Sequence, residues 1–227
     1  MKKYAVIVAG GSGTRMGTAT PKQFLQLHGK PVLWYTLETF LDAYDDLQIV
    51  LVLPADGFER GQAVAGMTVA SARVRLVEGG GTRYHSVQNG CRAIAAEIGG
   101  AEAVIFVHDG VRCLATRGLI HRCYEQALRV GSAVPVINSR DSVRMVTGAG
   151  SVAVDRTRIK LVQTPQTFKS RLLLPAYEAE YRESFTDEAT VVEAAGGDIH
   201  LLEGELNNIK ITMPEDLLIA EYLLRPA

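Results

Sequence analysis

Apolar stretches of strand length alternate along this chain with amphipathic stretches of helical spacing. The first apolar stretch, residues 4–9, is continuous and rich in valine, as expected of a strand buried on both faces. Similar stretches follow at residues 48–54, 74–78, 103–107, 133–137, 199–202 and 210–213. Apolar residues with helical spacing occupy residues 32–44, 86–97, 117–130 and 172–182. The alternation predicts an α/β protein with a doubly wound, mainly parallel sheet that is covered by helices on both faces.

Residues 138–167 break this alternation. Short β-prone pieces at residues 142–146, 151–154 and 159–162 surround Gly148-Ala149-Gly150, which indicates hairpins instead of a strand–helix unit. A lone hairpin buries little apolar surface, so we interpret the segment as a protruding β-arm that packs on a partner subunit. A hairpin that folds back on its own domain explains the pattern about equally well.

Several polar residues are expected to cap helices. Thr212 and Glu215 have the Thr-x-x-Glu spacing of a capping box just where the last amphipathic stretch begins. Thr186 or Asp187 is most simply an N-cap with acidic neighbours in the first turn. Ser86, taken by itself, is also an N-cap candidate.

The composition indicates one hydrophobic core, and the net charge indicates that any binding of anions is local. Of the 227 residues, 47% are hydrophobic, which suffices for a sizeable core in a chain just below the size that usually divides. We therefore treat residues 1–227 as a single domain. The formal net charge is −1, so no bulk basic field exists that would attract nucleic acid or an anionic membrane.

The cysteines and the N-terminus favour a cytoplasmic protein. Cys91, Cys113 and Cys123 are odd in number and lack Cys-x-x-Cys spacing, which argues against a disulfide framework and a structural zinc site. We expect them to be buried thiols in a reducing compartment. The apolar run at residues 4–9 is too short for the apolar region of a signal peptide or for a membrane span.

A glycine loop directly follows the first predicted strand. Because glycine lacks a Cβ and tolerates positive φ, this loop can turn tightly and point several backbone N–H groups at an anion. Such loops are also ordinary turns, and the glycines alone leave the two interpretations about equally favoured. Arg15 and Lys22 favour the anion site, because neighbouring cations repel each other unless an anion lies between them. The expected phosphate-binding positions of the loop are Ala9, Gly10, Gly11 and Gly13.

A second polar cluster follows the predicted strand at residues 103–107. Asp109 and Arg112 come just after this strand, where a ligand's hydroxyl and phosphate groups would be met in an α/β sheet. A plain Asp109–Arg112 ion pair within the chain is a strong alternative. His108 is expected to be structural, because no candidate nucleophile adjoins it.

Motifs at both ends of the chain resemble one enzyme family. Residues 10–17 and 21–33 read GGSGTRMG and PKQFLQLHGKPVL, which resembles the signature of nucleotidyltransferases that activate sugars and polyols. The PKQF form is similar to that of the 2-C-methyl-D-erythritol 4-phosphate cytidylyltransferase family. Residues 108–112 (HDGVR) resemble the family's HDAAR segment, and residues 207–217 (NNIKITMPEDL) resemble its NxKxTxPEDL signature. The resemblance runs from residue 4 to about residue 224 and implies a Rossmann-like nucleotidyltransferase fold.

The resemblance implies a site for CTP. Arg15 and Lys22 would stabilise the transition state in which a phosphate oxygen of the second substrate attacks the α-phosphorus of CTP. Free backbone N–H groups of Gly80 and Gly81 would suit the edge of a pyrimidine. In the family this glycine segment, together with the serine at Ser86, reads cytosine.

The resemblance also implies a pocket for a polyol phosphate. Arg156 and Lys210 would hold the attacking phosphate, and Arg156 belongs to the arm, which in the family comes from the other subunit of a homodimer. Arg144 stands where the family has a lysine, which keeps the charge and changes the geometry. The remaining positions expected to contact substrate are Asp109, Gly110, Arg112, Ser142 and Thr164.

The cofactor and two alternatives complete the expectations. A divalent cation, Mg²⁺ by preference, would be held mainly by triphosphate oxygens, because the sequence offers no cluster of carboxylates to bind it. A ribitol 5-phosphate cytidylyltransferase shares nearly all these motifs. From another class, a nucleotide-binding module without catalytic activity is less favoured, because Arg15, Lys22, Asp109 and Lys210 are all retained.

Overall fold

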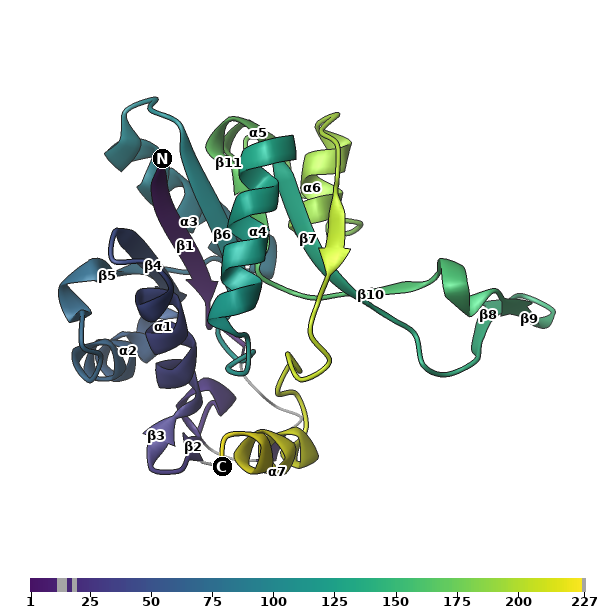
Figure 1. The fold of residues 1–227 in the computed structure, drawn as a ribbon, viewed down its shortest axis with the longest axis horizontal. Helices are drawn as coiled ribbons and strands as arrows, with labels where there is room; N and C mark the ends of the chain where they lie inside the picture. The colour runs from purple at the N-terminus through teal and green to yellow at the C-terminus, as the bar shows by residue number, and fades with distance from the viewer. Residues whose placement is uncertain (12–15, 18–19, 226–227) are drawn as a thin grey trace.

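A mainly parallel sheet forms the centre of the computed structural model, which describes residues 1–11, 16–17 and 20–225 (Figure 1). Within these residues the sheet has eight strands in the order β10-β7-β11-β6-β1-β4-β5, and β12 pairs with β7. β1 is parallel to β4 and β6, and β4 to β5, whereas β10 and β11 run antiparallel to their neighbours. The strands are β1 (Lys2–Val8), β4 (Leu47–Leu53), β5 (Val74–Glu78), β6 (Ala103–Asp109), β7 (Ser132–Asn138), β10 (Lys160–Val162), β11 (Gln166–Lys169) and β12 (Leu201–Glu203).

Helices cover both faces of this sheet. In β1, Ala5 and Ile7 point into one hydrophobic core, whereas Tyr4 and Val6 point into the other. The first core is closed by α1 (Val32–Ala43), α2 (Phe58–Gly66) and α4 (Arg117–Val130). The second is closed by α3 (Arg83–Ile98), α5 (Ser170–Ala176) and α6 (Glu188–Ala194). The doubly wound α/β class predicted from the sequence is therefore confirmed.

A third, smaller core joins the C-terminal helix α7 (Pro214–Leu223) to the loops after β1 and β6. Its buried side chains include Val111, Ile211 and Ala220. The short hairpin of β2 (Gln26–Leu27) and β3 (Lys30–Pro31) contacts the same helix, because His28 Nε2 donates to the Glu221 carbonyl oxygen at 2.8 Å. Figure 1 shows α7 at the lower end of the molecule, toward which β1 points.

The arm is a hairpin of β8 (Val143–Thr147) and β9 (Gly150–Val154), and it extends far from the central sheet (Figure 1). Its apolar side chains are unusually exposed, with Val146 at 84%. The alternative in which the hairpin folds back on its own domain is therefore wrong. The third β-prone piece does not belong to the hairpin, because β10 pairs with β7 at the edge of the main sheet.

Two expected elements differ from the structure, and strand β11 is an addition to the expected ones. Residues 210–213 form an extended connection and not a strand, since the Ile211 N–H donates to the loop at Val111 and the next two N–H groups donate to Asp216 in the first turn of α7. The helix expected at residues 172–182 ends at Ala176, after Pro175. Strand β11 was not predicted, because its four residues are too few to show a period, and it inserts between β6 and β7.

The helix caps were predicted with mixed success. Asp187 caps α6 by accepting from the Thr190 N–H, as predicted. At α7 the capping carboxylate is Asp216, one residue beyond the predicted Glu215, and it accepts from the Thr212 N–H at 2.8 Å. Thr82, not Ser86, caps α3, since the helix begins one turn earlier than the apolar pattern indicated.

The prediction that the cysteines are buried thiols is confirmed, since Cys91, Cys113 and Cys123 are all free and buried. Within the described residues, no helix is both long and apolar enough to cross a membrane. In the same part of the chain, no three histidine, cysteine, aspartate or glutamate side chains are grouped so as to hold a metal ion.

Candidate active site

A cavity of about 510 Å³ lies at the carboxyl ends of β1, β4, β5 and β6. This is the edge of an α/β sheet at which ligands collect. Its lining comes from the loops that follow these four strands and from two segments far apart in the chain, around Lys22 and Lys210. The lining residues are Val8, Ala9, Gly10, Gly11, Lys22, Gln23, Pro54, Ala55, Glu78, Gly79, Gly80, Gly81, Thr82, Arg83, Ser86, Asp109, Val111 and Lys210.

The first glycine loop and Lys22 share one wall of the cavity. Ala9 still continues the sheet, since its N–H donates to the Val52 carbonyl oxygen at 2.9 Å. Gln23 Nε2 donates to the Ala9 carbonyl oxygen at 2.7 Å and so joins the short helical turn at Lys22–Phe24 to this loop. Lys22 is 8% exposed. Two further predicted positions of this loop, Gly13 and Arg15, lie outside the described residues.

The second glycine loop is folded back on Ser86. The Gly80 N–H donates to Ser86 Oγ at 3.2 Å, and Ser86 Oγ donates to the Thr82 carbonyl oxygen at 3.0 Å. The expectation that the Gly80 N–H is free for a base is therefore wrong in this structure. Ser86 instead holds the loop against the first turn of α3, and Gly81 lines the cavity beside it.

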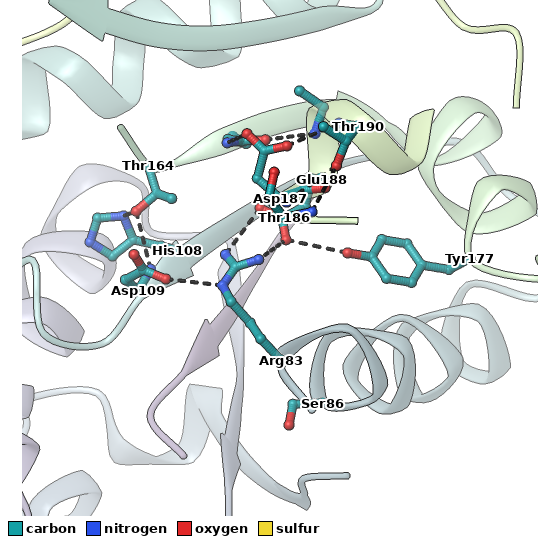
Figure 2. A network of polar contacts seen from close by, with 12 residues as sticks. Arg83, Ser86, His108, Asp109, Thr164, Tyr177, Thr186, Asp187, Glu188 and Thr190 are labelled. Atoms are coloured by element: carbon teal, nitrogen blue, oxygen red, sulfur yellow. Dashed lines mark hydrogen bonds and ion pairs between the residues drawn. The ribbon is translucent and has the colours of Figure 1, made fainter. Parts of the chain in front are cut away.

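Asp109 is the electrostatic centre of the site, and Figure 2 shows its contact with Arg83. Its Oδ2 lies 3.0 Å from Lys210 Nζ and 3.4 Å from Arg112 Nε, and its Oδ1 lies 3.3 Å from Arg83 Nε. Burial by itself raises the pKa of this carboxyl, but the three cations outweigh burial and hold the pKa of Asp109 well below its usual value. The predicted Asp109–Arg112 ion pair thus exists, as part of a larger cluster.

His108 and Thr164 hold the backbone on either side of the Asp109 side chain in place. His108 Nδ1 accepts from the Thr164 hydroxyl at 2.9 Å, and His108 Nε2 donates to the Arg112 carbonyl oxygen at 3.2 Å. Thr164 Oγ1 in turn accepts from the Asp109 N–H at 3.1 Å. Burial lowers the pKa of His108 to about 4, so the ring is neutral at physiological pH and both nitrogens are used within the protein. The structural role predicted for His108 is confirmed.

Lys210 is held in place by its neighbours in the chain. Asn208 is fully buried, and its carbonyl oxygen accepts from Arg112 Nη1 at 2.8 Å. On the other side, the Ile211 N–H donates to the Val111 carbonyl oxygen at 3.0 Å. The Lys210 side chain is therefore projected toward Asp109 from a fixed backbone, although the strand expected there is absent.

Comparison with known proteins identifies the family. Residues 4–226 match the family model described as 2-C-methyl-D-erythritol 4-phosphate cytidylyltransferase. The chain belongs to this family. It is accordingly a nucleotidyltransferase, as the resemblance of its motifs implied.

Individual relatives are similar over nearly the whole chain. A 2-C-methyl-D-erythritol 4-phosphate cytidylyltransferase of Bacteroides thetaiotaomicron is 46% identical over 224 residues, which cover 99% of this chain and 100% of the relative. A crystal structure of 4-diphosphocytidyl-2C-methyl-D-erythritol synthase from Anaerococcus prevotii has a TM-score of 0.83 at 27% identity, covering 99% of this chain and 96% of that one. The cytidylyltransferase of Thermus thermophilus has a TM-score of 0.75 at 31% identity, and both chains are fully covered.

The structure divides the predicted site residues of this family member into three groups. Gly110, Arg112 and Thr164 lie next to Asp109 without lining the cavity. Ser142 and Arg156 are exposed on the arm and are not part of the cavity of their own chain. The third group, which lines the cavity, consists of Ala9, Gly10, Gly11, Lys22, Gly80, Gly81, Ser86, Asp109 and Lys210.

Sequence reasoning left Arg83 and Glu188 out of the predicted site. Both guanidinium Nη atoms of Arg83 contact the Glu188 carboxylate, at 2.5 and 3.1 Å, and Glu188 is fully buried. The sequence around Glu188 predicts a helix cap and no more, because an acidic residue in a first helical turn is ordinary. The available signal was the position of Glu188 three and four residues before Val191 and Val192, which places it on the same face of the helix as these apolar residues.

Proposed function

We propose that this chain transfers the CMP group of CTP to 2-C-methyl-D-erythritol 4-phosphate and releases pyrophosphate. The observation that carries the proposal is the cavity itself, where Lys22 from one end of the chain and Lys210 from the other converge beside the first glycine loop. The family match supports the choice of substrates, because the description of the family names this polyol phosphate and a cytidylyl transfer. The ribitol 5-phosphate alternative is not favoured by that match.

The charges of the site suit two anionic substrates. Among the described residues of the cavity and the cluster behind it, the four cations Lys22, Arg83, Arg112 and Lys210 outnumber the three carboxylates Glu78, Asp109 and Glu188 by one positive charge. Backbone N–H groups of the first glycine loop would hold the triphosphate, with Lys22 close to the α-phosphorus. We propose that Arg15 acts beside Lys22, although its position lies outside the described residues.

The reaction is an in-line displacement. An oxygen of the polyol phosphate forms a bond to the α-phosphorus of CTP, and the bond from that phosphorus to the bridging oxygen of pyrophosphate breaks. No protein nucleophile or base is needed, because a phosphate monoester is already ionised at neutral pH. Asp109 is a poor base, since its pKa is held low, but it is well suited to accept a hydroxyl hydrogen bond from the polyol.

We propose that Mg²⁺ enters as part of the CTP complex. The carboxylates that line the described cavity are Glu78 and Asp109, and Asp109 is already shared by three cations. These residues do not form a ligand set for a metal, and the triphosphate oxygens would supply its main ligands.

We propose that the chain is a homodimer in which the arm completes the polyol-phosphate pocket of the other subunit. The arm exposes Ser142 and Arg156, the residues that the family resemblance assigns to this pocket. It also exposes apolar side chains, Met145 at 56% and Val152 at 47%, which a partner would cover.

A cytoplasmic location stays a prediction, supported by the free, buried cysteines.

A mixed dimer tests the arm. If Arg156 serves the partner's site, a heterodimer of one Lys22→Ala chain and one Arg156→Ala chain contains one intact site, and about half of the wild-type turnover is expected. If Arg156 serves its own chain, both sites carry a defect and the heterodimer stays as inactive as the two parents. Differently tagged chains allow the heterodimer to be purified before the assay.

A turnover assay tests the function. Pyrophosphate release is measured with CTP and either 2-C-methyl-D-erythritol 4-phosphate or ribitol 5-phosphate. We expect kcat/KM to favour the methylerythritol substrate by at least about a hundredfold, because a polar pocket left with unpaired groups discriminates strongly. A preference for ribitol 5-phosphate would overturn the substrate assignment. CTP binding without release of pyrophosphate from either polyol would instead indicate a module without catalytic activity.

A further inference from the structure

Arg83 shares its guanidinium between two carboxylates (Figure 2). The Nη1 and Nη2 atoms contact Oε1 and Oε2 of Glu188 at 2.5 and 3.1 Å, which is a bidentate pair. Only Nε faces Asp109, at 3.3 Å from Oδ1. Both Nη atoms of Arg83 therefore bind Glu188, whereas Asp109 receives a single, longer contact from Nε.

The structure fixes Glu188 firmly. Its side chain is fully buried, and Tyr177 Oη donates to Oε1 at 3.2 Å. Burial raises the pKa of Tyr177 well above its usual value, so this hydroxyl keeps its proton and remains a donor. A buried carboxylate that lost these partners would be costly, which means that Glu188 has little freedom to move away from Arg83.

The first turn of α6 is fastened to the sheet beside Asp109. Gln166 on β11 accepts from the Ala189 N–H at 2.8 Å and donates to Asp187 Oδ2 at 2.9 Å. In the sheet register Gln166 lies opposite Val107, two residues before Asp109 on β6. A rigid chain of contacts thus runs from the sheet through the start of α6 and Arg83 to Asp109.

An unrestrained Arg83 would behave differently. An arginine beside a carboxylate prefers the bidentate arrangement, in which both carboxylate oxygens are occupied. If Arg83 turned its Nη edge to Asp109, fewer acceptor positions would remain on that carboxylate for Lys210 and for a substrate hydroxyl group. Glu188 prevents this turn because it holds both Nη atoms.

We propose that Glu188 is a positioning residue that acts through Arg83 to keep the Asp109 carboxylate available to the polyol phosphate. The inference rests on the proposed function, in which Asp109 accepts from a substrate hydroxyl. Glu188 itself touches no substrate in this arrangement, and it does not line the cavity. Its effect should therefore be confined to the substrate that Asp109 contacts.

The first test compares Glu188→Gln with the wild type. Glutamine keeps the size of the side chain and removes its charge, which releases the Nη edge of Arg83. We expect KM for the polyol phosphate to rise roughly tenfold, the scale of one hydrogen bond to a charged group, while KM for CTP changes less than about twofold. Glu193→Gln on the same helix is the matched control, because Glu193 is exposed, and it should leave both KM values unchanged. Equal rises in both KM values, or no rise, would overturn the proposal.

A double-mutant cycle separates positioning from plain structural support. If Glu188 acts through Asp109, then Glu188→Gln should raise the polyol-phosphate KM no further in an Asp109→Asn background. A full additional tenfold rise in that background would overturn the proposal. If Glu188→Gln does not fold, Arg83→Lys replaces it, because lysine keeps the charge but cannot hold two carboxylates at once. The same selective rise is then expected, and an unchanged polyol-phosphate KM would contradict the inference.

The two proposals fail in different ways. A wild-type protein that does not turn over CTP with 2-C-methyl-D-erythritol 4-phosphate contradicts the proposed function. A wild type that does, combined with a Glu188→Gln variant of unchanged polyol-phosphate KM, contradicts only the role of Glu188.

Discussion

Asp109→Asn is expected to destabilise the protein strongly, and the reason lies in the charge cluster around this residue. The Asp109 side chain is 10% exposed and has three cationic groups within 3.4 Å. Removing one partner of a buried ion pair costs about 3–5 kcal/mol, and asparagine keeps one acceptor oxygen, so we expect the lower end, about 3 kcal/mol. For a domain of this size that corresponds to a Tm lower by roughly 6–12 °C.

The loss should depend on pH in a defined direction. The pKa of Asp109 is lower in the folded protein than in the unfolded chain, where an aspartate titrates near 3.9. The stabilisation is therefore fully present above about pH 4 and is lost as the pH falls toward the folded-state pKa. The difference in stability between the wild type and Asp109→Asn should be largest near pH 7 and should shrink below about pH 4.

Urea unfolding of both proteins between pH 3 and pH 7 measures this difference directly. Inorganic phosphate gives a second readout, because Arg112 and Lys210 lose their carboxylate partner in the variant and should bind anions, which restores part of the stability. A loss of less than about 1 kcal/mol at pH 7, or a difference that does not vary with pH, would refute the central place given to Asp109.

Three further predictions concern single residues. Lys22→Ala should lower kcat by roughly a hundredfold or more, the scale of losing one preorganised charge donor, and near-wild-type turnover would contradict its role. Arg156→Ala should act chiefly on the polyol phosphate, so an unchanged KM for that substrate in steady-state assays would count against the arm. Gly90→Ala should cost about 1–3 kcal/mol in thermal or urea unfolding, because its Cβ would lie 2.6 Å from Val6 Cγ1 between α3 and β1. Gly66→Ala at the end of α2 is the matched control, since nothing lies within 4 Å of its Cβ, and stability should not fall.

The parallel strands were predictable because a strand that is buried on both faces needs apolar residues at consecutive positions. Val6 and Ile7 face different cores, yet both must be apolar. The short antiparallel strand at Gln166–Lys169 has no such signature, since its first two buried residues, Gln166 and Thr167, are polar. Its position depends on pairing with β6 and β7, which only the folded chain reveals.

The site was predictable where a motif carries its own chemistry. The first glycine loop, Lys22 and Lys210 were found in this way and line one cavity. Glu188 was missed, because its role depends on Arg83, more than a hundred residues earlier in the chain. The hydrogen bond from the Gly80 N–H to Ser86 Oγ was also not predicted. No local sequence pattern shows that the Ser86 side chain turns back toward the glycine loop.

The small core beneath the carboxyl edge has a consequence for dynamics. Ile211 and Ala220 belong to the same buried cluster, so the backbone that carries Lys210 and the helix α7 should open and close as one cooperative unit. A ligand that holds Lys210 must then also slow hydrogen exchange at the backbone amides of α7, although these amides touch no substrate. Occupancy of the catalytic cavity would thus be reported by the C-terminal end of the chain, through local unfolding energetics and not through a change of shape.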